Sequence, residues 1–173
     1  ANTCHCTTAF QDGIFRLRGC DFVTINGIDL KENALNTTNP STMEYGYAMY
    51  KANVGDGCQN NTIKNCTITL NRINNATAAG IMLTGSVGIL IINSKDSFPT
   101  VGLAPTTAPG ANANNRIYNN TIQNCNIGIG VSGYAAAIVA AIDVNNDIGG
   151  QSAATANMII NYGGGSAATN PAY

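Results

Sequence analysis

Three oxygen-bearing side chains, Asp143, Asn145 and Asp147, stand at alternate positions and could bind calcium. Their spacing matches the first half of an EF-hand loop. However, Ile148 stands where that loop has its turn glycine, and Ala154 stands where its bidentate glutamate is expected. The alternative is a polar corner in which Asp and Asn side chains bond to their own backbone. Calcium is the one cofactor that the sequence suggests, and we otherwise expect none.

Carboxylate pairs could also do chemistry, because glycoside hydrolysis needs two carboxylates about 5 to 10 Å apart. The acids that lie close together in the sequence are Asp29 with Glu32 and Asp143 with Asp147. Each pair is more simply interpreted as a solvated turn. We therefore assign no catalytic residue.

Aromatic side chains could stack on sugar rings, and the one cluster of tyrosines is Tyr45, Tyr47 and Tyr50. Tyr45 and Tyr47 would share one face of a strand, with Tyr50 opposite. They form a candidate ligand-binding pair. The alternative, which we favour, is packing in the core.

Cys4-His5-Cys6 resembles part of a metal site, but zinc needs four ligands and the chain has no second histidine. Cys58 could form a disulfide with Cys4 or Cys6, and the sequence does not choose between these pairings.

A repeated sequence segment predicts the secondary-structure elements that position these residues. Residues 60–68 (NNTIKNCTI) return as residues 119–127 (NNTIQNCNI), and residues 17–22 form a looser copy. A β-patterned, Asn-rich repeat of this kind predicts a solenoid. The cysteines at the same place in each copy are predicted to be small core residues stacked on one another: Cys20, Cys66 and Cys125.

Sharp bends between short strands are predicted from the residues before these cysteines, Gly19, Asn65 and Asn124. Glycine and asparagine adopt the left-handed backbone conformation most readily. Short strands bounded by Gly or Asn recur along the chain, and a solenoid coil of roughly 20–30 residues would give about six or seven coils. We expect one domain over residues 1–173, with an irregular part at 1–12 and a protruding loop at 94–113. The chain is interpreted as a segment of a longer protein.

Composition restricts the partners. The formal net charge is −1 and only 10% of residues are charged, so no basic stripe is present to bind nucleic acid. The longest apolar run, residues 135–142, is far too short to cross a membrane. Low charge and abundant Asn, Thr and Gly favour a secreted protein.

The phrases Asn-Asn-Thr-Ile-x-Asn-Cys-x-Ile and Asn145-Asn146-Asp147-Ile148-Gly149-Gly150 resemble repeats of right-handed parallel β-helix proteins. They are similar in particular to large secreted or cell-surface proteins of Bacteroidota exported by the type IX route. The resemblance implies an all-β fold of three-stranded coils, with stacked Asn at bends such as Asn65 and Asn124. It carries little about activity, because this fold hosts lyases, hydrolases and adhesins alike.

The resulting expectation is a non-enzymatic, extracellular β-helix segment that serves as a stalk or adhesive surface and binds carbohydrate or neighbouring surface proteins. One alternative is a carbohydrate-active enzyme whose catalytic coils lie elsewhere. Another is an assembly subunit of a surface filament, pairing with flanking segments of the chain.

Overall fold

The computed structural model describes residues 13–37, 42–72, 85–134 and 137–163. In this part of the chain the structure is all-β, with three short 3-10 helices and no α-helix. Three four-stranded sheets are parallel throughout. Sheet 1 contains β1 (Gly13–Arg18), β4 (Tyr45–Tyr50), β7 (Val87–Ile92) and β12 (Ile127–Ser132). Sheet 2 contains β2 (Thr24–Asn26), β5 (Thr62–Lys64), β10 (Arg116–Tyr118) and β13 (Asp147–Ile148), and sheet 3 contains β3 (Leu30–Lys31), β6 (Thr67–Thr69), β11 (Thr121–Cys125) and β14 (Met158–Tyr162).

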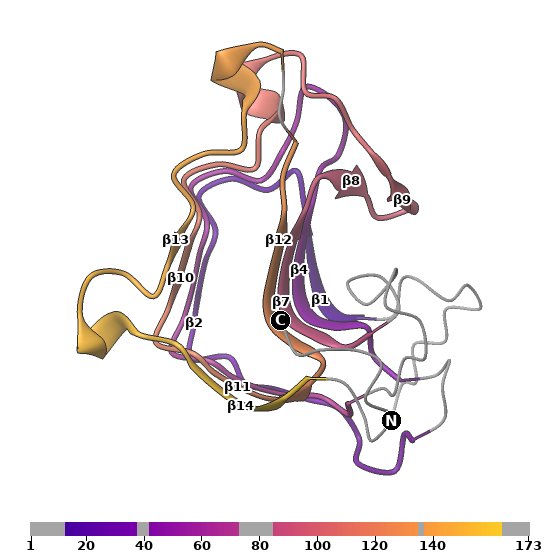
Figure 1. Ribbon diagram of the computed structural model, residues 1–173, viewed down its shortest axis with the longest axis vertical. Helices are drawn as coiled ribbons and strands as arrows, with labels where there is room; N and C mark the ends of the chain where they lie inside the picture. Colours follow the sequence, from indigo (N-terminus) through magenta and orange to yellow (C-terminus); the bar gives the residue numbers. More distant parts are fainter. Residues whose placement is uncertain (1–12, 38–41, 73–84, 135–136, 164–173) are drawn as a thin grey trace.

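The chain visits sheets 1, 2 and 3 in the same order four times. We call each pass a circuit: circuit 1 is β1-β2-β3, circuit 2 is β4-β5-β6, circuit 3 is β7-β10-β11 and circuit 4 is β12-β13-β14. In Figure 1 the strands of each sheet lie behind one another, and the sheets form three sides of a common interior. The sequence predicts six or seven coils, but the described residues make four circuits. The reason is that residues in register lie 31 to 54 positions apart, further than the expected coil length.

The interior is filled by rows of aliphatic side chains in register. Ile25, Ile63 and Ile117 form one row in sheet 2, and Leu30, Ile68 and Ile122 form one in sheet 3. All six are buried. Each circuit therefore buries its apolar face against the circuits beside it, as stacked repeats require.

Sheet 1 is buried on both faces in its two central strands. Its outer face forms a second apolar cluster that includes Ala48, Tyr50, Val87 and Leu90. Gly46 allows sheet 1 to lie close to sheet 3, because a Cβ at this position would be 2.5 Å from Cγ2 of Ile68 and 2.7 Å from the carbonyl oxygen of Gly88.

The sequence repeat does not correspond to the stacking of circuits. Thr121 pairs with Thr67, whereas the repeated segment aligns it with Thr62. The first copy runs from β5 into β6, and the second runs from β11 into β12. The two copies are alike because each encodes a strand, a left-handed bend and another strand. They lie at different corners of the fold.

The predicted stacking of the three repeat cysteines is therefore wrong. Cys20 lies between sheets 1 and 2, Cys66 between sheets 2 and 3, and Cys125 at the end of β11. Cys66 and Cys125 are buried, Cys20 is partly buried, and all three thiols are free. Cys58 is also a buried free thiol, while Cys4 and Cys6 lie outside the described residues. The backbone φ angles of Gly19, Asn65 and Asn124 are 55°, 57° and 57°, the left-handed conformation predicted for these bends.

The segment predicted as a protruding loop, residues 94–113, contains regular structure. Strands β8 (Ser94–Lys95) and β9 (Phe98–Gly102) form an antiparallel pair that projects from the stack (Figure 1). A 3-10 helix, η2, spans Ala108–Gly110. The last part of the segment then returns to the core, where Ala111, Asn112 and Ala113 are buried. The irregular part expected at residues 1–12 lies outside the described residues.

Candidate functional site

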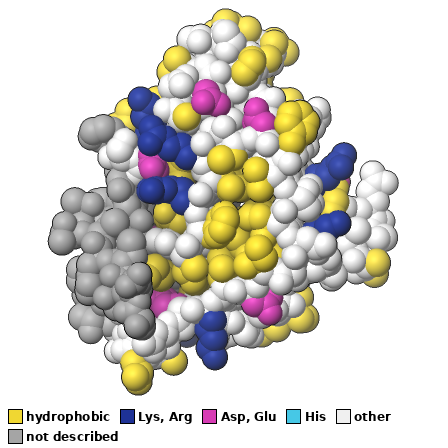
Figure 2. Space-filling view, turned by 180° about the vertical axis from the view of Figure 1, so that it is seen from behind, with side chains coloured by type: hydrophobic (Ala, Val, Ile, Leu, Met, Phe, Trp, Pro, Cys, Tyr) yellow, Lys and Arg dark blue, Asp and Glu magenta, His cyan; other side chains and the backbone are white. Residues whose placement is uncertain are grey.

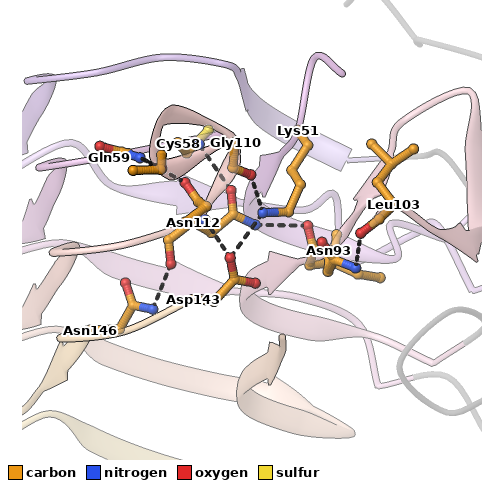
Figure 3. A network of polar contacts seen from close by, with 12 residues as sticks. Lys51, Cys58, Gln59, Asn93, Leu103, Gly110, Asn112, Asp143 and Asn146 are labelled. Carbon is orange, nitrogen blue, oxygen red and sulfur yellow. Dashed lines mark hydrogen bonds and ion pairs between the residues drawn. The ribbon is translucent and has the colours of Figure 1, made fainter. Parts of the chain in front are cut away.

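A buried ion pair joins circuit 2 to the segment between β12 and β13. Nζ of Lys51, which follows β4, lies 2.9 Å from Oδ1 of Asp143. Lys51 is fully buried and also donates a hydrogen bond of 2.5 Å to the carbonyl oxygen of Gly110 (Figure 3). Burial lowers the pKa of the Lys51 ammonium, and the hydrogen bond to Asp143 opposes this effect.

Asn112 connects the ion pair to the neighbouring backbone. Its N–H donates to Oδ1 of Asp143 at 2.6 Å, and its own Oδ1 accepts the N–H of Cys58 at 2.9 Å. Its amide nitrogen donates to the carbonyl oxygen of Ile92 at 3.0 Å (Figure 3). Oδ2 of Asp143 is buried without a hydrogen-bond partner. The ion pair and Asn112 thus tie three circuits together at one corner.

Two further rows of Asn side chains run along the stack, and we call them ladders. In the first ladder, between sheets 1 and 2, Oδ1 of Asn115 accepts the N–H and the amide nitrogen of Asn61 at 3.1 and 3.0 Å. Oδ1 of Asn146 accepts the same two groups of Asn115, again at 3.1 and 3.0 Å. In the second ladder, between sheets 2 and 3, Oδ1 of Asn157 accepts both groups of Asn120 at 3.0 Å.

The ladders satisfy backbone groups that the bends leave unpaired. The amide nitrogens of Asn115 and Asn120 also donate to the carbonyl oxygens of Cys58 and Ile63. Asn115 and Asn120 are almost fully buried. A buried carbonyl or N–H without a partner costs roughly 1–3 kcal/mol, so these contacts hold each circuit to the next.

The ladder residues were missed by the sequence analysis, although a signal is present. Within the described residues, Asn-Asn doublets begin at Asn60, Asn114, Asn119 and Asn145, and the first residue of each has a φ between 49° and 59°. The second residue of each of these doublets points inward and belongs to a ladder. Lys51 carries no comparable signal.

The calcium candidates do not converge. Asp143 pairs with Lys51, while Oδ2 of Asp147 accepts the hydroxyl of Tyr118 at 2.6 Å. Asn145 forms a left-handed bend and donates to Oδ1 of Asn114. The alternating pattern therefore produces a corner, since the bend at Asn145 separates the two carboxylates. Among the residues that the structure describes, no three potential metal ligands cluster.

The tyrosines considered for sugar stacking are packed in apolar clusters, which is the alternative favoured from the sequence. Tyr45 and Tyr47 are buried, so neither ring offers a face to a carbohydrate. The expectation that Tyr45 and Tyr47 share one face with Tyr50 opposite is wrong, because Tyr45 lies with Tyr50 in the apolar cluster outside sheet 1 and Tyr47 lies in the interior. The Tyr47 hydroxyl donates to the carbonyl oxygen of Ile28 at 2.7 Å. Burial raises the pKa of both Tyr47 and Tyr50.

Asn65 and Asn124, expected to stack at bends, each pair with an Asn of another circuit. Asn119 donates to Oδ1 of Asn65 at 2.8 Å, and Asn161 donates to Oδ1 of Asn124 at 2.6 Å. These contacts are exposed, in contrast to the buried ladders.

Acidic side chains near the first circuit act as acceptors for backbone N–H groups. Oδ1 of Asp21 accepts the N–H of Gln59 at 2.7 Å, and Oδ1 of Asp29 accepts that of Thr67 at 2.6 Å. Glu32 accepts the N–H of Asn71 at 2.8 Å. The Asp29–Glu32 pair thus links circuits 1 and 2.

No helix in the described part of the chain has the length and apolar character needed to cross a membrane. Comparison with known proteins found no matching family model, no matching curated protein and no matching solved structure.

Proposed function

We propose that this chain is a segment of a right-handed parallel β-helix whose role is structural, as a rigid stalk of an extracellular or cell-surface protein. The repeated sheet order and the parallel register support the β-helix, since parallel strands joined by crossovers are almost always right-handed. The low charge and the abundance of Asn and Gly support an exported protein.

One observation carries the structural role: among the described residues, an ion pair and two ladders of mostly buried polar side chains join one circuit to another. Lys51 and Asp143 join circuits 2 and 4, and the ladders at Asn115 and Asn120 continue from circuit to circuit. Such contacts resist separation of the circuits, because pulling them apart would leave several buried donors and acceptors unpaired at once.

The contacts of the acidic residues and the burial of two thiols support a non-enzymatic role. Asp21, Asp29 and Glu32 accept backbone N–H groups of circuit 2, so each carboxylate has a structural contact. Burial raises the pKa of the Cys58 and Cys125 thiols to about 11, so both are protonated at neutral pH and are poor nucleophiles.

Hydrogen exchange on the purified chain tests this proposal. We expect the corner amides of Asn61, Asn115 and Asn120 to exchange as slowly as the strand amides, through global opening. Fast local exchange at these corners would contradict a rigid stalk. Incubation with a panel of acidic and neutral polysaccharides provides a second test, in which release of new reducing ends or unsaturated sugars would favour the enzyme alternative.

A further inference from the structure

The two ends of the stack differ in how well their interior is covered. At equivalent inward positions, Leu17, Ile25 and Leu30 of circuit 1 are 3–7% exposed, whereas Val131, Ile148 and Ile159 of circuit 4 are 38–44% exposed. Circuit 4 is therefore the end whose core residues most lack a cover. Figure 1 is seen from the circuit 4 end, whereas Figure 2 shows the opposite end from behind, with hydrophobic side chains at its centre and charged side chains around them.

A hollow of about 520 Å³ lies at the circuit 4 end. Its walls include Ile129, Ile148 and Ile159, together with Asn157 of the second ladder. In the interior of the stack, the corresponding space above each circuit is filled by the aliphatic row of the next.

The ladders specify what could fill this space. Where two Asn residues of a ladder are neighbours, the N–H and the amide nitrogen of one donate to Oδ1 of the next. Asn146 and Asn157 are the last residues of the two ladders, and both are only partly buried. A circuit placed against β12, β13 and β14 would complete both ladders if it carried a side-chain oxygen at each of the two positions.

We propose that the β12-β13-β14 end docks a further polypeptide circuit of parallel β-structure that carries Asn or Asp at both ladder positions and aliphatic residues opposite Val131, Ile148 and Ile159. The occupant is argued from continuity, since each of the three sheets pairs one parallel strand with the next three times, and both ladders take an Asn-to-Asn step between circuits 3 and 4. This proposal rests on the structural role proposed above and specifies the partner of that role.

A second copy of this chain is a poor occupant. In a head-to-tail pair it would present circuit 1, whose residues at the ladder positions are Val23 and Ile28. Neither side chain has an oxygen. The amide nitrogens of Asn146 and Asn157 already donate to the carbonyl oxygens of Asn112 and Ile117, so a head-to-tail pair would cover the backbone N–H and the second amide hydrogen of each Asn without an acceptor, at a cost of roughly 1–3 kcal/mol for each group.

The test uses two insertions between Gly163 and Gly164 of the full chain. The first insertion duplicates residues 127–163, and the second is identical except that the copies of Asn146 and Asn157 are changed to Val and Ile, as in circuit 1. The readout is amide exchange of Ile148 and of Met158 to Tyr162 in the original circuit 4. We expect this exchange to be on the order of tenfold slower with the first insertion than with the second, because only the first insertion completes the two ladder steps.

Equal protection by the two insertions, or no protection by either, would overturn the proposal. Amides of β1 and β4 report whether the host chain remains folded in each protein. The oligomeric state of the unmodified chain is the second measurement: we expect a monomer by sedimentation, and head-to-tail association through the circuit 4 end would overturn the ladder requirement. The structural role is tested separately, by hydrogen exchange of the corner amides in the unmodified chain. A failure of the structural role can therefore be distinguished from a failure of this docking proposal.

Discussion

Asp143 lies 2.9 Å from Lys51 although the two residues are separated by 92 positions in the sequence. Both side chains are buried, and the carboxylate also receives the N–H of Asn112. A buried ion pair is costly to form, since each charge loses its hydration. Removing only one of the two charges is more costly, because the other charge then remains buried without a partner.

Removing one partner of this pair is expected to destabilise the chain strongly. Lys51→Met and Asp143→Asn should each lower the free energy of unfolding by about 3–5 kcal/mol, because each leaves one buried charge without a counter-charge. The double variant should lose much less than the sum of the two, since no buried charge remains and the introduced amide oxygen still accepts the N–H of Asn112. Urea unfolding of the four proteins measures this coupling, and additive losses would contradict it.

The two residues of an Asn-Asn doublet are expected to respond oppositely to glycine. Asn115→Gly removes ladder contacts to Asn61 and Cys58 and should cost roughly 2–4 kcal/mol, because several buried groups lose their partners. Asn114→Gly should change stability little, since Asn114 is exposed and its φ of 59° suits glycine. Similar losses in the two variants, measured by thermal unfolding, would show that the ladder contributes nothing specific.

A single methyl group at Gly46 is expected to disturb the contact between sheets 1 and 3. Gly46→Ala places a Cβ 2.5 Å from Ile68 and 2.7 Å from the carbonyl oxygen of Gly88, and such overpacking costs about 1–3 kcal/mol or more. Gly55→Ala is the matched control, because the nearest atom to its Cβ would be 3.5 Å away. The difference between their denaturation midpoints tests the close approach.

Stability is expected to fall between pH 9 and 11. Burial raises the pKa of the Cys58 and Cys125 thiols from 9.0 to about 11. In this window the unfolded chain releases these protons before the native chain does, so unfolding becomes more favourable as pH rises, by up to about 2–3 kcal/mol per thiol.

The variant Cys58→Ala isolates this contribution. Its stability should fall less steeply between pH 9 and 11 than that of the unmodified chain. Tyr47 and Tyr50, whose pKa values burial also raises, and Lys51, whose lowered pKa acts in the opposite direction, are present in both proteins. Identical slopes would contradict the assignment to Cys58.

Local backbone preferences made part of this structure predictable from the sequence. Asn and Gly accept a positive φ at little cost, so the bends at Gly19, Asn65 and Asn124 could be placed before the fold was known. Alternating apolar residues likewise predicted short strands, and the all-β, parallel architecture of the described residues agrees with that prediction.

Only the tertiary structure decided which bends and strands lie side by side. The two copies of the repeated segment have the same local backbone conformation. Local conformation does not determine how many residues separate one circuit from the next. The register of Thr67 with Thr121 is therefore set by packing of the aliphatic rows. The same packing pairs Lys51 with Asp143 and separates Asp143 from Asp147. It also divides Tyr45 and Tyr47 between two clusters. Such long-range contacts produce no periodic pattern in the sequence from which they could be predicted.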